Sequence, residues 1–313
     1  MPEEIRSVYA YELHGHDADG PLDYGQFFAS LAQLTSRQRQ FQLVRSNEVV
    51  AIPEVRAVGD VYELRFLIGR EGEMARFYDL QSGTEREAAP QRGEVAVQGS
   101  WLVIDTAARL VVQERRRPGV PLQLAIRGLT GIGRERGIAT NLTISLGPIA
   151  DRGFIEELDG LDRIKSAAVI MQRPNMSWTN TADSILSDYA EDSNVGTVEF
   201  GATARPKDSL SKNSGIIADI KAMVSTAFGP LTNVRIVGRQ DGESKDRTVS
   251  LKQHARRREI QIPQAASPAE EQEVLLSGAL SYLNDLVEER GYPEERPVPR
   301  RPQSQPRARK GGQ

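Results

Sequence analysis

The sequence predicts a mixed α+β protein of two domains, and three observations support this fold class. The chain has 313 residues and is 39 % hydrophobic, enough to build two cores. Its apolar residues alternate in some stretches and recur at helical spacing in others. We expect an N-terminal antiparallel β-rich domain with one helix, a bridging helix and linker, a C-terminal ferredoxin-like split βαβ domain with an extra helix and hairpin, and a disordered basic tail. Their ranges are 1–118, 119–140, 141–292 and 293–313.

The first domain opens with a strand, because apolar and polar residues alternate from Ile5 to Leu13. Asp23 is then placed to cap a helix with an apolar stripe over Tyr24, Phe27 and Leu31. Short apolar runs broken by Gly, Asp and Pro follow and indicate an antiparallel sheet or small barrel. The clearest hairpin joins 101–105 to 110–114.

The boundary between the domains is expected near Arg115–Gly119, where a run of arginines meets Pro118. Val120–Leu129 has the spacing of a bridging helix. Gly131, Gly133 and Gly137 do not make a phosphate-binding loop, because they follow a predicted helix rather than a strand. We interpret this glycine-rich stretch as a flexible, charged linker.

The second domain begins with a strand, helix and strand. Leu142, Ile144 and Leu146 alternate with polar residues, Asp151 is placed to cap a helix, and 167–171 is a short apolar run. Further elements are expected as a helix over 185–189, a strand over 197–204, a helix over 216–224, a strand over 234–237, a hairpin joining 248–251 to 259–262, and a last helix that begins at Pro268 with Ser267 as its cap. This order resembles a ferredoxin-like core.

Composition excludes several classes of protein. The chain has no cysteine, which rules out disulfides, Cys-ligated metals and a thiol nucleophile. No apolar run reaches the roughly 18 residues that a membrane span needs, and the first residues are acidic rather than basic. We therefore expect a cytoplasmic protein without direct membrane insertion.

Positive charge is concentrated at few places. Residues 296–313 contain six basic residues and no acid, so removing them from the net charge of -3 leaves -9 for the first 295 residues. An anionic body with cationic clusters predicts non-specific binding to a phosphate backbone, most simply DNA. The expected contact residues are Lys252, His254, Arg256, Arg257 and Arg258 of the predicted hairpin and Arg300, Arg301, Arg307, Arg309 and Lys310 of the tail.

The sequence shows no constellation for turnover, and we expect no cofactor and no catalytic residue. No serine has the setting of a nucleophile elbow. The loop with His14, His16 and Asp17 has two imidazoles and a carboxylate that could ligate a divalent metal, so a metal-dependent nuclease or toxin is one alternative. A protein-interaction scaffold is another, with the stripe of Val274, Leu283 and Leu286 docking a partner or a second copy.

Three segments resemble a family of two-domain proteins from prophages and mobile elements that is distantly similar to RexA, the sensor of the lambda Rex superinfection-exclusion system. They are 101–105 with 110–114, 142–175 with its Met-Gln-Arg-Pro-Asn end, and 197–205 followed by Ser-Leu-Ser-Lys-Asn-Ser-Gly-Ile at 209–216. The resemblance implies a DNA-binding homodimer without catalysis that acts in phage exclusion or prophage maintenance, with a membrane or toxin partner encoded nearby. It supplies no residue-level site.

Overall fold

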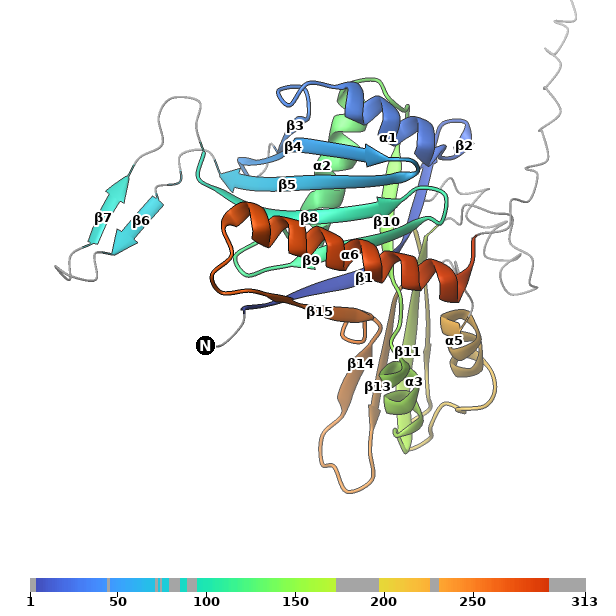
Figure 1. Ribbon diagram of the computed structural model, residues 1–313. Helices are drawn as coiled ribbons and strands as arrows, with labels where there is room; N and C mark the ends of the chain where they lie inside the picture. The colour runs from blue at the N-terminus through green and yellow to red at the C-terminus, as the bar shows by residue number, and fades with distance from the viewer. Residues whose placement is uncertain are drawn as a thin grey trace, which may run out of the picture.

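The computed structural model describes residues 4–43, 46–70, 73, 75–78, 85–88, 95–172, 197–225 and 231–292. Over these residues the protein is a mixed α+β structure, as predicted, in which helices cover both faces of a large antiparallel sheet and a smaller sheet extends below it (Figure 1). None of the helices in the described part of the chain is both long and apolar enough to cross a membrane.

The large sheet is built around its first strand. Its order is β10-β1-β9-β8-β5-β4-β3, and β15 and β2 also pair with β1. Residues 7–9 of β1 pair with both β9 and β15, and residues 11–12 pair with both β9 and β10. Therefore β15 and β10 lie end to end along the edge of β1 opposite to β9. The strands are β1 (Glu4–Asp17), β2 (Gly20–Pro21), β3 (Gln40–Leu43), β4 (Glu48–Val58), β5 (Val61–Arg70), β8 (Val97–Asp105), β9 (Leu110–Arg115), β10 (Thr143–Pro148) and β15 (Arg257–Ile262), and a separate ribbon pairs β6 (Ala75–Tyr78) with β7 (Glu85–Ala88).

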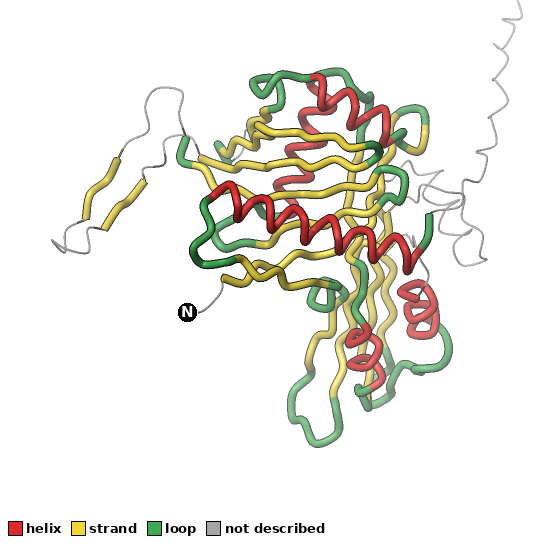
Figure 2. The backbone as a smooth tube through the Cα atoms, in the orientation of Figure 1, coloured by secondary structure: helices red, strands yellow, loops and turns green. Residues whose placement is uncertain are grey.

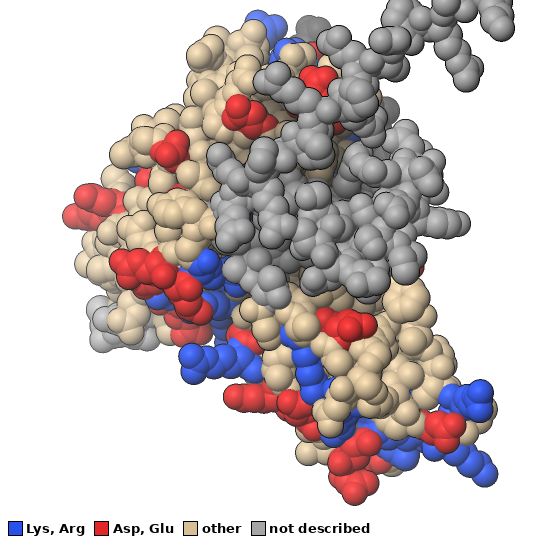
Figure 3. All heavy atoms as spheres, turned by 90° about the vertical axis from the view of Figure 1, so that its right-hand side faces the viewer, with Lys and Arg blue, Asp and Glu red and all other residues tan. Residues whose placement is uncertain are grey.

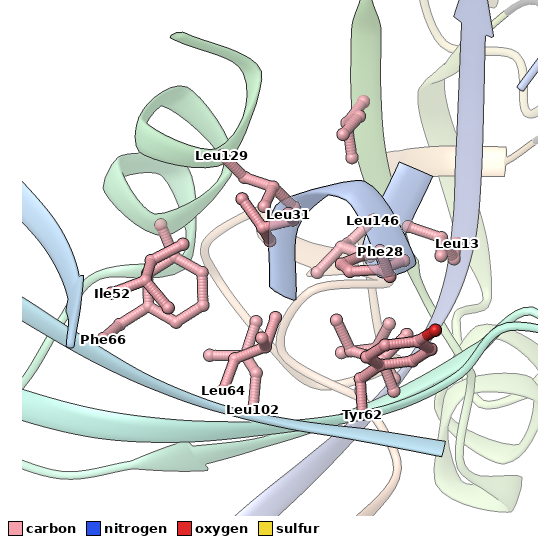
Figure 4. Packing of buried hydrophobic residues seen from close by; sticks show 14 of the residues in the cluster. Leu13, Phe28, Leu31, Ile52, Tyr62, Leu64, Phe66, Leu102, Leu129 and Leu146 are labelled. Carbon is pink, nitrogen blue, oxygen red and sulfur yellow. The ribbon is translucent and has the colours of Figure 1, made fainter. Parts of the chain in front are cut away.

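Two helices pack on one face of this sheet, and their core holds most of the large apolar side chains (Figure 4). Helix α1 (Tyr24–Gln33) begins where predicted, because the Asp23 side chain accepts a hydrogen bond from the Gln26 N–H. Phe28 and Leu31 of α1 and Leu64 of β5 belong to this core, and all three are fully buried.

Helix α2 (Leu122–Glu135) includes Gly131 and Gly133, so the interpretation of this part as a flexible linker is wrong, whereas Gly137 lies in the turn after the helix. A Cβ atom added at Gly128 would lie 2.3 Å from Cγ1 of Val50, and one at Gly131 would lie 2.5 Å from the Phe41 ring. Gly128 and Gly131 both lie within the helix. Because they have no side chains, α2 can approach β3 and β4 closely.

Helix α6 (Pro268–Arg290) crosses the other face of the sheet, in front of β8, β9 and β1 in Figure 1. The predicted start is confirmed, because Ser267 and Glu270 form a capping box with Pro268 at the first turn. Leu283 and Leu286 of the stripe that we considered for docking a partner are fully buried, and Val274 packs against the same cluster. The stripe covers the protein's own sheet and is not available to a partner.

The smaller sheet is antiparallel and has the order β12-β11-β13-β14, with β11 (Arg163–Gln172), β12 (Thr197–Thr203), β13 (Leu231–Arg239) and β14 (Arg247–Ser250). Helices α3 (Arg152–Asp159) and α5 (Ile216–Ser225) share a core with one of its faces. Asp151 caps α3 as predicted, by accepting a hydrogen bond from the Phe154 N–H. In Figure 2 its strands lie below the large sheet and α6.

Two elements lie elsewhere than in the expected ferredoxin-like arrangement. Strand β10, expected as the first strand of the second domain, pairs with β1 in the large sheet. The expected hairpin does not form either, because β14 pairs with β13 whereas β15 pairs with β1. The reason is burial: Ile260 and Ile262 of β15 share a buried cluster with Val8 of β1 and with α6.

A candidate nucleic-acid interface

The two arginines at the centre of the predicted cationic hairpin are paired with carboxylates of α6. Nη2 of Arg256 lies 2.6 Å from the Glu289 carboxylate, and Nη2 of Arg258 lies 2.6 Å from that of Asp285. The hydrogen bond from Arg256 lowers the pKa of Glu289. The charges of Arg256 and Arg258 are therefore neutralised by neighbouring carboxylates, and the two ion pairs connect α6 to the segment around the start of β15.

The other predicted residues of this segment are dispersed. His254 lies between two acids, with Nε2 2.6 Å from Glu157 and Nδ1 3.4 Å from Asp151. Lys252 is exposed in the turn after β14, and Arg257 is exposed at the start of β15. A hydrogen bond to Tyr9 raises the pKa of Arg257. The five residues span the connection between two sheets and do not form one basic surface. The predicted tail residues Arg300, Arg301, Arg307, Arg309 and Lys310 lie outside the described residues.

The predicted metal ligands are all on β1, but only the two histidines lie together. His14 and His16 are both buried on the same face of the strand, whereas the Asp17 carboxylate accepts a hydrogen bond from the Asp19 N–H. Burial lowers the pKa of His14 to about 4, with smaller contributions from His16 and Arg109. Within the described ranges, no group of three His, Cys, Asp or Glu side chains is placed to hold a metal ion.

A different surface has unpaired positive charge: the face of the smaller sheet turned away from α3 and α5. Alternation along β13 creates it, because Val234 and Ile236 point into the core and Arg235, Val237 and Arg239 point the other way. We call this surface the open face.

Strand register shows which residues share the open face. One row across the sheet consists of Gly201, Ala168, Arg235 and Ser250, and the next consists of Thr203, Ser166, Val237 and Thr248. Arg235 is exposed, and it is the only long side chain in these two rows. Beyond them Arg163 pairs with Arg239 across the strands. On the other side of Arg235 the next row consists of Glu199, Ile170 and Asn233. The open face therefore combines small side chains with one guanidinium near its centre, two more at one end and the exposed Glu199 carboxylate toward the other.

The charges of this sheet are biased toward the positive. Its four strands contain five basic residues, Arg163, Lys165, Arg235, Arg239 and Arg247, and one acidic residue, Glu199. Lys165 lies 3.3 Å from Asp246, and Arg247 is near Glu157 of α3. Acidic and basic side chains are interspersed at the lower end of Figure 3.

The guanidinium groups of the open face have few partners. Arg163 donates from Nε to the backbone carbonyl of Asp208. In the described part of the chain no carboxylate lies within 4.0 Å of the guanidinium nitrogens of Arg163, Arg235 or Arg239. These groups are free to bind an anion.

Sequence reasoning missed the open face, although a signal was present. Arg235, Val237 and Arg239 alternate with apolar residues in Val-Arg-Ile-Val-Gly-Arg, the pattern of a strand with one cationic side.

Comparison with known proteins adds no assignment: no protein-family model matches the chain, and no curated protein matches it significantly.

Proposed function

We propose that this protein binds nucleic acid, in the first place DNA, without sequence specificity and through the open face. The observation that carries the proposal is the set of guanidinium groups of Arg163, Arg235 and Arg239 on the face of the smaller sheet opposite α3 and α5, without carboxylate partners among the described residues. A guanidinium presents a planar fork of donors that matches two phosphate oxygens, and it keeps its charge at any physiological pH.

The small side chains around Arg235 support this proposal. Gly201, Ala168 and Ser250 in its row leave no bulky group above the sheet, so a phosphate backbone can approach closely. Ser and Thr hydroxyls in the same rows can donate to phosphate oxygens as well. Neither row contains an aromatic side chain on which a base could stack, which favours backbone contacts over base reading.

The basic tail, the cytoplasmic location and the family resemblance that the sequence suggests are all compatible with binding to nucleic acid. Basic residues of 296–313 would add salt-sensitive affinity to that of the open face. A cytoplasmic protein of a prophage or mobile element that acts in phage exclusion is the context that the family resemblance suggests. A ferredoxin-like relationship would concern the unit of α3, α5 and the smaller sheet.

The test compares two double variants that remove the same charge. Arg235→Gln with Arg239→Gln acts on the open face, and Arg37→Gln with Arg127→Gln acts on exposed positions of the loop after α1 and of α2. We expect the first pair to weaken binding of a short DNA duplex about tenfold or more at low salt, since each lost phosphate contact costs on the order of 1 kcal/mol. Equal affinities of the wild type and the Arg235/Arg239 variant would refute the proposal, as would equal weakening by both pairs.

A further inference from the structure

Strand β12 ends the smaller sheet, and its outer side is unpaired within the described structure. All seven of its residues, Thr197–Thr203, pair with β11 on the inner side. Glu199, Phe200, Gly201 and Thr203 are exposed. The outward backbone N–H and C=O groups of such a strand are a template for another strand.

This edge has few of the features that normally prevent pairing, and its one charged side chain is that of Glu199. Natural edge strands are protected by proline, by lysine, by bulges or by shortness. Strand β12 contains neither residue, has no bulge in its pairing with β11 and is seven residues long. The opposite edge strand, β14, has only four residues.

An exposed aromatic side chain lies at the middle of the same strand. Phe200 is 49 % exposed, one of the few large apolar side chains of the described structure that are so exposed. It pairs across the strands with Val169, which is buried under the helices. Phe200 therefore lies on the face of the sheet that carries α3 and α5, but these helices do not cover its side chain. A strand added beside β12 would shield this ring from water.

The strand is complementary to itself. When two copies of β12 run antiparallel about a two-fold axis through residue 200, Phe200 meets Phe200 and Glu199 meets Gly201. The remaining pairs are Val198 with Ala202 and Thr197 with Thr203. An aromatic pair across strands is favourable, and Glu199 lies opposite Gly201 rather than opposite a like charge, with the Glu199 residues of the two copies diagonal to each other.

From these observations we propose that a second copy of this chain pairs with β12, antiparallel and centred on Phe200, to form a continuous eight-stranded sheet. A two-fold interface of this kind uses one patch twice and closes on itself. The inference concerns assembly and does not depend on what the protein binds.

The pairing has one consequence that rests on the proposed nucleic-acid binding. The open faces of the two copies become one surface, with five strand spacings between Arg235 of one copy and Arg235 of the other. At about 4.8 Å per spacing this is roughly 24 Å, a distance suited to two phosphates of one duplex rather than two separate molecules.

Cysteine cross-linking tests the register, because the chain has no cysteine of its own. Residues directly opposite on antiparallel strands have Cα atoms about 4.5–5.5 Å apart, within the range of a disulfide. Under mild oxidation we expect Phe200→Cys to give a covalent dimer on a non-reducing gel. We expect no such product from Thr203→Cys, which would face Thr197, or from Thr248→Cys on β14.

A second measurement covers the case in which a variant disturbs folding. The wild type should sediment as a dimer at high concentration, and Phe200→Glu should shift it to monomer while Thr248→Glu, with the same added charge on the opposite edge, should not. A monomeric wild type would overturn the inference, as would equal cross-linking of the three cysteine variants. A wild type that dimerises but does not bind DNA would count against the proposed function alone.

Discussion

Arg258 of β15 donates from Nη2 to the carboxylate of Asp285 on α6 across 2.6 Å, and its guanidinium carbon lies 4.5 Å from the centre of the Tyr282 ring. The sequence places Arg258 in a run of three arginines, whose charge suggested a nucleic-acid contact. In the folded protein that charge joins β15 of the large sheet to α6, which packs on that sheet. Arg258 thus stabilises the packing of α6 on β15, whereas Arg235 has no carboxylate partner in the described structure.

Arg258→Ala should lower the stability of the protein and leave DNA affinity nearly unchanged. Both partners of the ion pair are partly exposed, so the pair contributes about 0.2–1 kcal/mol. The cation–π contact with Tyr282 adds on the order of 0.5–1 kcal/mol. Urea unfolding should therefore show a loss of about 1 kcal/mol, and a mobility-shift titration should match the wild type. An unchanged unfolding midpoint together with weaker DNA binding would show that Arg258 contacts the ligand instead.

The salt dependence of DNA binding should report how many open-face cations contact phosphates. Each phosphate that a cation neutralises changes the slope of log K against log salt by about 0.9 for duplex DNA. Arg235→Gln with Arg239→Gln should therefore make the slope shallower by roughly 2, whereas Arg37→Gln with Arg127→Gln should preserve it. Binding measured between about 50 and 200 mM salt gives both slopes. Parallel lines for the wild type and the Arg235/Arg239 variant would show that neither guanidinium binds phosphate.

Local features of the fold could be predicted because their causes are local. Asp23, Asp151 and Ser267 cap helices at the positions that their side chains and the following apolar spacing indicate. The placement of β10 and β15 could not be predicted in this way. Each pairs with a different part of the same edge of β1, and this pairing depends on whether distant residues such as Ile260 and Val8 bury each other.

The same distinction applies to the candidate site. The alternation of Arg235 and Arg239 is visible in the sequence, but their shared surface with Arg163 depends on the register between β11 and β13. Arg256 and Glu289 are 33 positions apart in the chain, and they pair only because α6 packs beside β15. The pattern of charges in the sequence does not reveal this packing.

Gly128→Ala should destabilise the protein even though alanine is the better helix former. The added Cβ would lie 2.3 Å from Cγ1 and 2.7 Å from Cβ of Val50, so α2 or β4 must move. Overpacking of this kind costs about 1–3 kcal/mol, more than the roughly 1 kcal/mol gained from helix propensity. Gly25→Ala in α1 is the matched control, because its nearest neighbour beyond the adjoining residues is Oδ1 of Asp23 at an ordinary 3.5 Å. Thermal unfolding should show a lower midpoint for Gly128→Ala and an equal or higher one for Gly25→Ala; a midpoint for Gly128→Ala at or above that of the wild type would contradict the close approach of α2.

His14 should make the stability of the protein depend on pH in a window set by its lowered pKa. Burial holds the pKa of His14 at about 4, against 6.5 in an unfolded chain, despite Glu12 Oε2 at 3.8 Å from its Nε2. The unfolded state therefore takes up a proton below about pH 6.5 while the folded state stays neutral. This contribution is fully present above pH 6.5 and is lost as the pH falls toward 4. The shift corresponds to about 3 kcal/mol at most.

His14→Gln, which replaces the imidazole by an amide that does not titrate, isolates this contribution. At pH 8 neither state of the wild type protonates His14, so the difference in free energy of unfolding between the two proteins there measures packing alone. As the pH is lowered from 6.5 to 4 the wild type should lose stability relative to the variant by up to about 3 kcal/mol, because only the wild type has this buried neutral histidine. Urea unfolding at four or five pH values measures the difference, and other titrating groups largely cancel in it. A difference that stays constant across the window would mean that His14 is protonated equally in both states, and hence that it is not enclosed as the structure places it.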